Sequence, residues 1–428
     1  MQTIKFYTLG CKVNQYETQL MRERILLSGI REEKGVNTAD FCVINTCTVT
    51  HRADADSLSS IYRAKRQNPE AKIIVTGCLA EADAQRISGL GNIDLIVRNK
   101  DKQIIDTYLN SFRRSGRERK TGQDKENKRG GISYFAGHTR AFIKVQDGCD
   151  NLCSYCKVRL VRGKSKSRDW SHIIEEARRL VESGVKEIVL CGICLGSYGR
   201  DLSARLNLTQ LISRLEDING LLRIRLSSIE AKDVSGALIK KMASSLKLCP
   251  HLHIPIQSGD NKILRLMKRG ITREGYLRIF DKVRRHIPGI AITTDVMVGF
   301  PQEAEENFLN TFRLIKEVSP LRVHIFGYSP RKGTVASRLY GAISPKVIGV
   351  RMERLKELAE SCSIKYRSRF LNKEIAVLIE GRYKETGHWQ GYTGNYMKIV
   401  VKSRQALGNQ LIHRKPYRVF KDYMEAEI

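Results

Sequence analysis

The stretch CDNLCSYC places three cysteines, Cys149, Cys153 and Cys156, within eight residues at the spacing CxxxCxxC. A structural zinc site binds four ligands. Neither Cys nor His follows in the next dozen residues, so a fourth ligand would have to come from a distant part of the chain. Three thiolates on an iron–sulfur cube instead leave one iron open to a small molecule. The spacing therefore favours a reactive cluster, with a zinc site as the alternative.

A second group of cysteines, Cys11, Cys47 and Cys78, is spread over the start of the chain. Each directly follows a predicted strand, in FYTLG, VINT and IIVTG. Because ligands bind at the carboxyl ends of parallel strands, these thiols are expected to converge. They suit an iron–sulfur cluster or zinc. The alternative for each is an ordinary buried cysteine, and Cys42, inside an apolar strand, fits that alternative well.

The eleven cysteines do not suggest a disulfide framework, because an odd number cannot pair completely. The start of the chain, MQTIKFYTLGCKVN, lacks the basic and apolar segments of a signal peptide. No apolar run is long enough to cross a bilayer. We therefore expect a cytoplasmic protein with reduced thiols and no membrane contact.

Strand and helix patterns divide the chain into parts that must position these thiols. Residues 1–112 alternate strands with helices, which predicts a doubly wound parallel sheet. Residues 113–131 contain no aliphatic or aromatic side chain and are interpreted as a charged linker or loop. The alternation resumes in residues 135–368, as in a partial (βα) barrel. Short β segments in 369–428 predict a small five-stranded barrel.

The charge of the chain indicates a polyanionic partner. Lys and Arg number 75 against 45 Asp and Glu, and the formal net charge is +30. Basic residues occur throughout the sequence, and nucleic acid is the commonest partner of such a protein. A generally basic proteome is the alternative explanation.

Several motifs together resemble the radical S-adenosylmethionine methylthiotransferase family. The CxxxC-x-aromatic-C pattern, with Tyr155 as the aromatic residue, is similar to the radical S-adenosylmethionine signature. LGCKVNQYET, NTCTVT and TGCLAE resemble the family's N-terminal domain, and HIPIQSG, MKRGIT and TTDVMVGFPQE resemble its barrel. GYTGNY in the last segment resembles the RNA-binding TRAM barrel. The resemblance extends over nearly the whole chain and implies this three-domain fold.

The resemblance also implies two [4Fe–4S] clusters and S-adenosyl-L-methionine as cofactors. The catalytic cluster would be bound by Cys149, Cys153 and Cys156, and its open iron would be chelated by S-adenosylmethionine. The second cluster would be bound by the N-terminal thiols and would carry or deliver the sulfur. The residues expected to bind the cofactor are Tyr155, Gly192, Ser228, Glu230, Gln257, Gly299, Phe300, Pro301 and Glu303. For a glycine taken alone, turn formation is the simpler explanation.

The resemblance implies tRNA as substrate, and aromatic and basic side chains of the last segment are candidates to bind it. Tyr396 suits base stacking and the barrel core equally well. The opening TLGCKVNQYET is most similar to the branch acting on N6-threonylcarbamoyladenosine at position 37 of tRNA. The alternatives are isopentenyladenosine at the same position, a ribosomal-protein aspartate, and a non-catalytic zinc-containing RNA-binding protein. The candidate RNA-binding residues are Trp389, Tyr392, Tyr396 and Lys398.

Some positions depart from the family pattern. Lys157 and Arg159 follow the third loop cysteine where an apolar residue and a proline are usual, and Cys191 replaces a small hydroxyl residue. Cys191 and Cys194 form a CxxC pair, but without partner cysteines a further metal site is not expected. The remaining expectations are a reducing electron donor such as flavodoxin or ferredoxin, and a monomeric chain.

Overall fold

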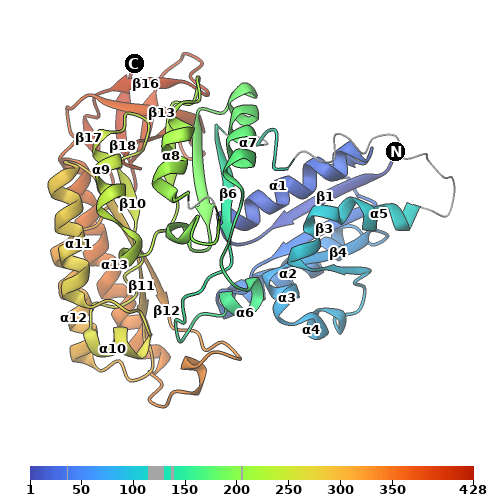
Figure 1. The fold of residues 1–428 in the computed structure, drawn as a ribbon, viewed down its shortest axis with the longest axis horizontal. Coiled ribbons are helices and arrows are strands. Elements are labelled where there is room, and N and C mark those ends of the chain that lie inside the picture. The colour runs from blue at the N-terminus through green and yellow to red at the C-terminus, as the bar shows by residue number, and fades with distance from the viewer. Residues whose placement is uncertain (36, 114–129, 136–138, 204–205) are drawn as a thin grey trace.

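The computed structural model describes residues 1–35, 37–113, 130–135, 139–203 and 206–428. Three regions follow one another along the chain: an N-terminal parallel sheet with helices, a central partial barrel and a C-terminal β domain (Figure 1). The fold class predicted from the sequence is confirmed. Most of the predicted linker lies outside the described residues.

The N-terminal region is a parallel sheet with the strand order β2-β1-β3-β4-β5. This is the doubly wound order in which ligands bind beyond the carboxyl ends of β1 and β3, where the winding reverses. β3 reads FCVINT and is buried throughout, as expected of a central parallel strand. The strands are β1 (Thr3–Thr8), β2 (Arg31–Glu32), β3 (Phe41–Thr46), β4 (Lys72–Gly77) and β5 (Leu95–Val97).

Helices cover both faces of this sheet. Cys11 is the N-cap residue of α1. Its side chain accepts no hydrogen bond from the first N–H groups of the helix. α1 packs Met21 and Ile25 against the sheet, while it also lies beside β6 of the barrel (Figure 1). The elements are α1 (Lys12–Leu27), α2 (His51–Gln67), α3 (Cys78–Ala82), α4 (Ala84–Ser88), η1 (Asn99–Ile104) and α5 (Ile105–Arg113).

The central region has six parallel strands in two ladders, β6-β8-β9 and β10-β11-β12, with the short β7 antiparallel to β6. Single parallel bridges such as Ser228 with His253 join the ladders. The result is a partial barrel whose strand ends face one side. The strands are β6 (Arg140–Asp147), β7 (Lys166–Ser167), β8 (Glu187–Gly192), β9 (Arg223–Leu226), β10 (His251–His253), β11 (Ala291–Val298) and β12 (Arg322–Gly327).

Amphipathic helices surround the barrel and bury aliphatic side chains against the strands. Ser344 caps the longest one, and Pro345 occupies its first position, where proline is favourable. No helix among the described residues is long and apolar enough to span a membrane. The elements are α6 (Val158–Arg162), α7 (Trp170–Glu182), η2 (Leu195–Ser197), α8 (Leu208–Glu216), η3 (Ala231–Asp233), α9 (Gly236–Ser244), α10 (Asn261–Leu266), α11 (Arg273–His286), α12 (Glu305–Val318), η4 (Ala336–Arg338) and α13 (Pro345–Ser368).

The C-terminal region is a six-stranded sheet with the order β16-β13-β14-β15-β18-β17. The prediction of five strands was therefore wrong by one short strand. β17 has only two residues, and a strand of that length leaves no alternating pattern to detect. The strands are β13 (Ile375–Arg382), β14 (Trp389–Thr393), β15 (Lys398–Lys402), β16 (Leu411–Arg414), β17 (Arg418–Val419) and β18 (Met424–Glu427).

Buried arginines connect the three regions. Arg331, after β12, donates to Thr48 Oγ1 at 2.6 Å and to Asp54 Oδ2 at 2.7 Å in the N-terminal region. Arg225 on β9 donates to the carbonyl oxygens of Thr393 and Gly394 in the C-terminal region. These contacts hold the regions around the strand ends of the barrel. We retain 1–112, 135–368 and 369–428 as proposed domain boundaries.

Candidate active site

A cavity of about 510 Å³ extends from the carboxyl ends of the barrel strands, at Gly192 of β8, to the amino ends of β10 and β12, at His251 and Arg322, and residues of all three regions line it. The loop thiols Cys149, Cys153 and Cys156 line it together with Cys11 of the N-terminal region. A second cavity of about 320 Å³ shares Cys156 with the first and is also lined by Cys78. The carboxyl ends of barrel strands are the usual position of catalytic residues. Thiols from both sequence groups therefore face connected space.

The three N-terminal thiols, here called the sheet triad, come together because glycine permits close approach of the strand ends. A Cβ on Gly10 would lie 2.7 Å from the Sγ atom of Cys47, which is closer than such atoms approach. Gly77 immediately precedes Cys78 at φ +96°, where a side chain would meet the Thr46 backbone. Glycine at these two positions lets the ends of β1, β3 and β4 converge.

The thiols of the sheet triad influence one another. Burial, together with the nearby Cys78 and Cys11, raises the pKa of Cys47 to about 11. Burial also raises the pKa of Cys78, against the opposing charges of Arg162 and Lys102. Without metal, the Cys47 and Cys78 thiols are therefore mostly protonated near neutral pH, and binding of metal would displace their protons.

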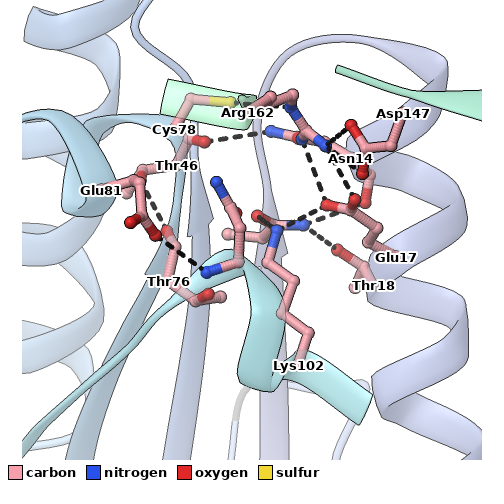
Figure 2. Close-up of polar contacts among 12 residues, drawn as sticks. Asn14, Glu17, Thr18, Thr46, Thr76, Cys78, Glu81, Lys102, Asp147 and Arg162 are labelled. Atoms are coloured by element: carbon pink, nitrogen blue, oxygen red, sulfur yellow. Dashed lines mark hydrogen bonds and ion pairs between the residues drawn. The ribbon is translucent and has the colours of Figure 1, made fainter. Parts of the chain in front are cut away.

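Arg162 of α6 reaches from the barrel to the sheet triad, as Figure 2 shows. Its Nε donates to Cys78 Sγ at 3.3 Å, and its Nη2 donates to Asn14 Oδ1 at 2.7 Å. Its Nη1 lies 2.8 Å from Glu17 Oε1 and 3.1 Å from Asp147 Oδ1. One buried guanidinium thus contacts a sulfur of the triad and carboxylates from both regions.

Glu17 is the centre of this charged network (Figure 2). It pairs with Lys102 at 2.5 Å and Lys144 at 2.9 Å as well as with Arg162. Burial would raise the pKa of Glu17, but the three cations outweigh it and hold that pKa well below its ordinary value. The carboxylate is therefore charged, which is the state that a buried cation cluster requires.

The loop thiols, here called the loop triad, lie in the turn after β6. The Cys149 Sγ atom accepts from the backbone N–H of Asn151 at 3.4 Å, and the Cys153 Sγ atom accepts from Arg269 Nη1 at 3.6 Å. Burial raises the pKa of Cys156 to about 11. Asn151 and Arg269 both line the large cavity, so these donors contact the sulfur atoms at the cavity wall.

A fourth thiol lies beside the loop triad. A hydrogen bond from Cys194 lowers the pKa of Cys149 despite its burial, and the same contact raises the pKa of Cys194. Cys191 is also buried and lines the cavity. The CxxC pair therefore lies at the site, with Cys194 as a neighbour of a loop-triad thiol.

Both triads fit an iron–sulfur cluster by the chemistry of their donors. Nowhere in the described part of the chain do three His, Cys, Asp or Glu side chains converge closely enough to hold a single metal ion. In a four-iron cube each thiolate binds a different iron, so its ligands stand further apart. The N–H and guanidinium groups beside Cys78, Cys149 and Cys153 are hydrogen-bond donors of the kind that tune cluster sulfurs.

Five of the predicted cofactor-binding residues line the large cavity: Tyr155, Gly192, Ser228, Glu230 and Gln257. Glu230 forms an ion pair with Arg269 at 2.5 Å, and Arg269 also contacts a loop-triad thiol. The Oε1 atom of Gln257 is buried without a hydrogen-bond partner among the described residues. These groups surround space beside the loop triad where a polar cofactor can bind.

The predicted residues of the motif GFPQE do not line either cavity. Glu303 is 1% exposed, and it accepts from the Gly299 N–H at 2.6 Å and from Arg351 at 3.2 Å. Phe300 packs in a buried cluster, and Pro301 is buried beside it. The motif closes the turn after β11, so its role in this structure is to shape the barrel end.

The candidate RNA-binding residues divide into two sets. Tyr396 lines the large cavity, where the guanidinium of Arg225 lies 4.4 Å from its ring. Tyr392 contacts the Tyr396 ring at 5.3 Å. Trp389 does not line this cavity, and the centre of its ring lies 3.8 Å from the guanidinium of Arg382. Lys398 lines another groove, of about 250 Å³. Tyr396 thus belongs to the site, while Trp389 and Lys398 face outward from it.

Sequence reasoning missed several residues of the site. Arg269 stands in MKRGIT and Arg162 in VRG, but the motifs give no reason to place either one at a sulfur atom. His251, His253 and His324 line the cavity from β10 and β12. His251 and His253 are the first and last residues of β10, whereas His324 lies within β12, so only the first two stand at strand ends. Among the departures from the family pattern, Arg159 lines the large cavity and Lys157 the smaller one.

Two family models match the chain. Residues 3–98 match a model described as uncharacterized protein family UPF0004, and residues 143–315 match the radical SAM superfamily. Two solved structures share the fold at low identity. The radical S-adenosylmethionine methyltransferase TsrM from Kitasatospora setae matches with a TM-score of 0.56 at 12% identity over 78% of this chain and 76% of that one. The cobalamin-dependent enzyme OxsB matches with a TM-score of 0.53 at 11% identity over 84% and 56%.

Curated proteins match over almost the whole chain. The threonylcarbamoyladenosine tRNA methylthiotransferase MtaB of Bacillus subtilis (strain 168) is 38% identical, over 100% of this chain and 96% of its own. The protein of that name from Thermotoga maritima is 38% identical, over 93% and 91%. A tRNA-2-methylthio-N6-dimethylallyladenosine synthase from Moorella thermoacetica is 33% identical, over 96% and 95%.

Proposed function

The chain belongs to the radical S-adenosylmethionine tRNA methylthiotransferase family, and we propose that it converts N6-threonylcarbamoyladenosine at position 37 of tRNA to its 2-methylthio derivative. The enzymes of this family use S-adenosylmethionine and [4Fe–4S] clusters. The curated relatives at 38% identity act on threonylcarbamoyladenosine by name, whereas the dimethylallyladenosine synthase is 33% identical. This difference favours the threonylcarbamoyladenosine branch.

One observation carries the proposal: Cys11 of the sheet triad lines the large cavity together with all three thiols of the loop triad. We assign one cluster to Cys11, Cys47 and Cys78 and the other to the loop triad. Bound together, the two clusters and S-adenosylmethionine supply radical activation of a C–H bond and the sulfur and methyl group that replace its hydrogen. An adenosine in the large cavity would be close to both triads, as methylthiolation requires.

The protein side chains prepare the site for this chemistry. Arg269, held by Glu230, donates to Cys153 and fixes the loop triad against the barrel. Arg162 donates to Cys78 and fixes the sheet triad against the same barrel. The three regions together enclose the cavity, and such enclosure excludes water from a reactive intermediate. Positioning and shielding are therefore the tasks of this chain's own residues.

We assign tRNA as the macromolecular partner and the cytoplasm as the location of the reaction. A groove lined by Lys356, Arg367, Lys398 and Lys421 adjoins the large cavity, because Arg322 and Tyr396 line both. Basic side chains in such a groove suit the phosphate backbone. A flavodoxin- or ferredoxin-like donor would supply electrons, and the chain would act as a monomer.

The substrate is tested with the anaerobically reconstituted full-length protein. Three anticodon stem-loop RNAs carry threonylcarbamoyladenosine, isopentenyladenosine or unmodified adenosine at position 37, and nucleosides are measured by mass spectrometry. We expect the methylthio product on the first RNA only. A product on the isopentenyl RNA alone would overturn the branch assignment. Cys42→Ala, a buried cysteine outside both triads, serves as the control variant.

A further inference from the structure

One wall of the large cavity is built from residues of all three regions and is called here the cationic wall. It consists of Lys12 at the start of α1, His251 on β10, Arg322 and His324 on β12, and Tyr396 between β14 and β15. Apart from Lys12, which directly follows Cys11, these residues lie outside the segments that carry the two triads. Its composition indicates an anionic ligand.

The two full cations of the wall have no partner. Neither the Lys12 ammonium nor the Arg322 guanidinium makes a hydrogen bond or an ion pair with any described residue; Arg322 only approaches the Tyr396 ring at 5.8 Å. By contrast, Arg225 and Arg269, which also line the cavity, pair with carboxylates at 2.6 and 2.5 Å. Unpaired cations that share a cavity with paired ones point to a ligand that brings its own negative charge.

The acidic side chains of the cavity do not compensate this charge. Glu230 pairs with Arg269, and the Asp295 carboxylate, which contacts His253 at 3.1 Å, offsets only one positive charge of the lining. Arg159 lines the cavity too and has no ion pair among the described residues, which adds to the excess. Positive charge therefore predominates in the lining of the cavity, with Lys12 half-buried and Arg322 exposed where the cavity meets the outer groove.

Lys12 and Arg322 act on the same small volume although they are 310 positions apart. Burial first, and then the charges of neighbours that include both cations, lower the pKa of His251 well below its ordinary value. Burial and the same two cations also lower the pKa of His324. Both imidazoles are neutral, so they offer hydrogen bonds beside the two positive charges.

Buried polar atoms of the same cavity lack partners. His251 is 3% exposed, and its Nδ1 atom has no hydrogen bond among the described residues, whereas its Nε2 atom contacts Thr293 Oγ1 at 3.0 Å. Ser227 Oγ and Gln257 Oε1 are buried and unpartnered as well. Buried polar groups are normally satisfied. A polar ligand in the cavity would supply the missing partners.

Tyr396 connects this wall to the outside. Its backbone has φ +67°, a conformation that is uncommon for a residue with a side chain, and its ring lies 4.8 Å from the His251 ring. Burial would raise the pKa of Tyr396, but the charges of Arg140, Lys12 and Arg225 lower it overall. The ring stands where the basic groove and the cavity join, a suitable place to stack a base that enters.

We propose that the cationic wall binds the carboxylate of the threonylcarbamoyl group on the target adenosine, with Lys12 and Arg322 as its charged partners. This inference rests on the proposed function. The threonyl part carries a carboxylate and a hydroxyl group, which match two cations and neutral imidazoles. An isopentenyl group carries neither and would leave both cations without an anionic partner. The wall is thus a determinant of specificity for the acidic substituent.

A phosphate of the RNA is the competing ligand for the same cations. It would make the wall a general RNA contact, because every RNA carries phosphate whatever its modified base. The half-buried Lys12, the buried His251 and the unpartnered polar atoms that line the same cavity favour a group attached to the inserted base. The experiment separates the two by changing the carboxylate alone.

The test is a double-mutant cycle in which one change is made in the protein and the other in the RNA. It measures the interaction free energy between the changed side chain and the carboxylate. Anticodon stem-loop RNA carrying threonylcarbamoyladenosine is compared with the same RNA whose threonyl carboxylate is a methyl ester. Both are titrated against reconstituted wild-type protein and Arg322→Gln by fluorescence anisotropy without reductant, so that binding is read without turnover. Arg278→Gln, an exposed arginine on α11 with no ion pair among the described residues, is the matched control.

We expect Arg322→Gln to weaken binding of the acid RNA by about tenfold or more, as for loss of a charged hydrogen bond. Binding of the ester RNA should change less than about twofold, and Arg322→Lys should restore most of the difference. Lys12→Gln should show the same pattern at unchanged iron content, which is checked because Lys12 follows Cys11.

Equal losses on both RNAs would assign Arg322 to phosphate and overturn the proposal, and unchanged binding of both would also overturn it. Failure of the proposed function looks different. In that case wild-type protein would methylthiolate the isopentenyl RNA instead of the acid RNA, whatever the result of the cycle.

Discussion

The two thiol triads are built in opposite ways. The sheet triad comes from the ends of three strands of a parallel sheet; its Cys47 and Cys78 are only 5% and 8% exposed, whereas Cys11 is exposed. The loop triad comes from a single turn after β6, and all three of its cysteines are partly exposed. A sheet fixes its ligands through many long-range contacts, whereas a loop fixes them through local chain geometry and a few hydrogen bonds.

Their hydrogen-bond donors differ as well. The sheet triad receives its guanidinium from another region, because Arg162 belongs to the barrel. The loop triad receives Arg269 from its own barrel. The sheet triad therefore depends on the docking of two regions, while the loop triad depends on one. The contrast leads to predictions in which one triad fails and the other persists.

Loss of a loop-triad thiol should have the largest effect. Cys149→Ala should abolish formation of 5′-deoxyadenosine and reduce iron from about eight to about four atoms per chain, since only the sheet cluster remains. Iron and sulfide assays with product chromatography measure both. Cys362→Ala, a buried cysteine on α13, should leave both values unchanged. Undiminished 5′-deoxyadenosine from Cys149→Ala would refute the assignment.

Loss of a sheet-triad thiol should abolish methylthio transfer but leave cleavage of S-adenosylmethionine intact. Cys47→Ala should also remove about half of the iron. It should still cleave S-adenosylmethionine, because the loop triad is complete, but form no methylthio product. Nucleoside mass spectrometry and 5′-deoxyadenosine assays on one sample make the comparison, with Cys42→Ala from the same sheet as control. Methylthio product from Cys47→Ala would contradict a role of the sheet triad in transfer.

Removal of the connecting arginine should weaken the sheet triad alone. Arg162→Gln leaves Glu17 and Asp147 with less compensation, and removal of one partner of a buried pair costs about 3–5 kcal/mol. Urea unfolding of the metal-free protein measures this loss. In proteins that lack the loop cysteines, the sheet cluster should reduce at a more negative potential without its charged donor.

Arg159→Gln is the matched control for Arg162→Gln, because it lies on the same helix and makes no ion pair among the described residues. It should change the free energy of unfolding by less than about 0.5 kcal/mol. Equal destabilisation by both variants would show that the ion pairs of Arg162 with Glu17 and Asp147 contribute no more to the free energy of unfolding than an unpaired arginine does.

A change in the outer groove should have the smallest effect and leave both triads intact. Lys398→Gln should weaken tRNA binding by up to about fivefold and reduce the salt dependence of log K by about one. Affinity measured at several salt concentrations gives both quantities, at unchanged iron content. Lys240→Gln, exposed on α9, is the control. If the salt dependence of log K does not change, Lys398 does not contact the RNA.

The sequence by itself determined which thiols form each group. Apolar runs such as IIVTG and VINT mark buried parallel strands, and a cysteine directly after each run must lie at the carboxyl edge of the sheet. The spacing CxxxCxxC is local, so no tertiary information is needed to group its thiols. The fold class followed from the same alternation of strands and helices.

Only the tertiary structure decided what stands next to these thiols. Arg162 donates a hydrogen bond to Glu17, which is 145 positions away in the sequence. Lys12 and Arg322 are 310 positions apart and line the same cavity. The motif GFPQE follows a strand like the true cavity residues, yet its turn folds inward around Glu303. Periodicity reports the burial and face of an element, but side chains from separate regions meet only through domain packing. That packing is why the charged environment of the site could not be read from spacing.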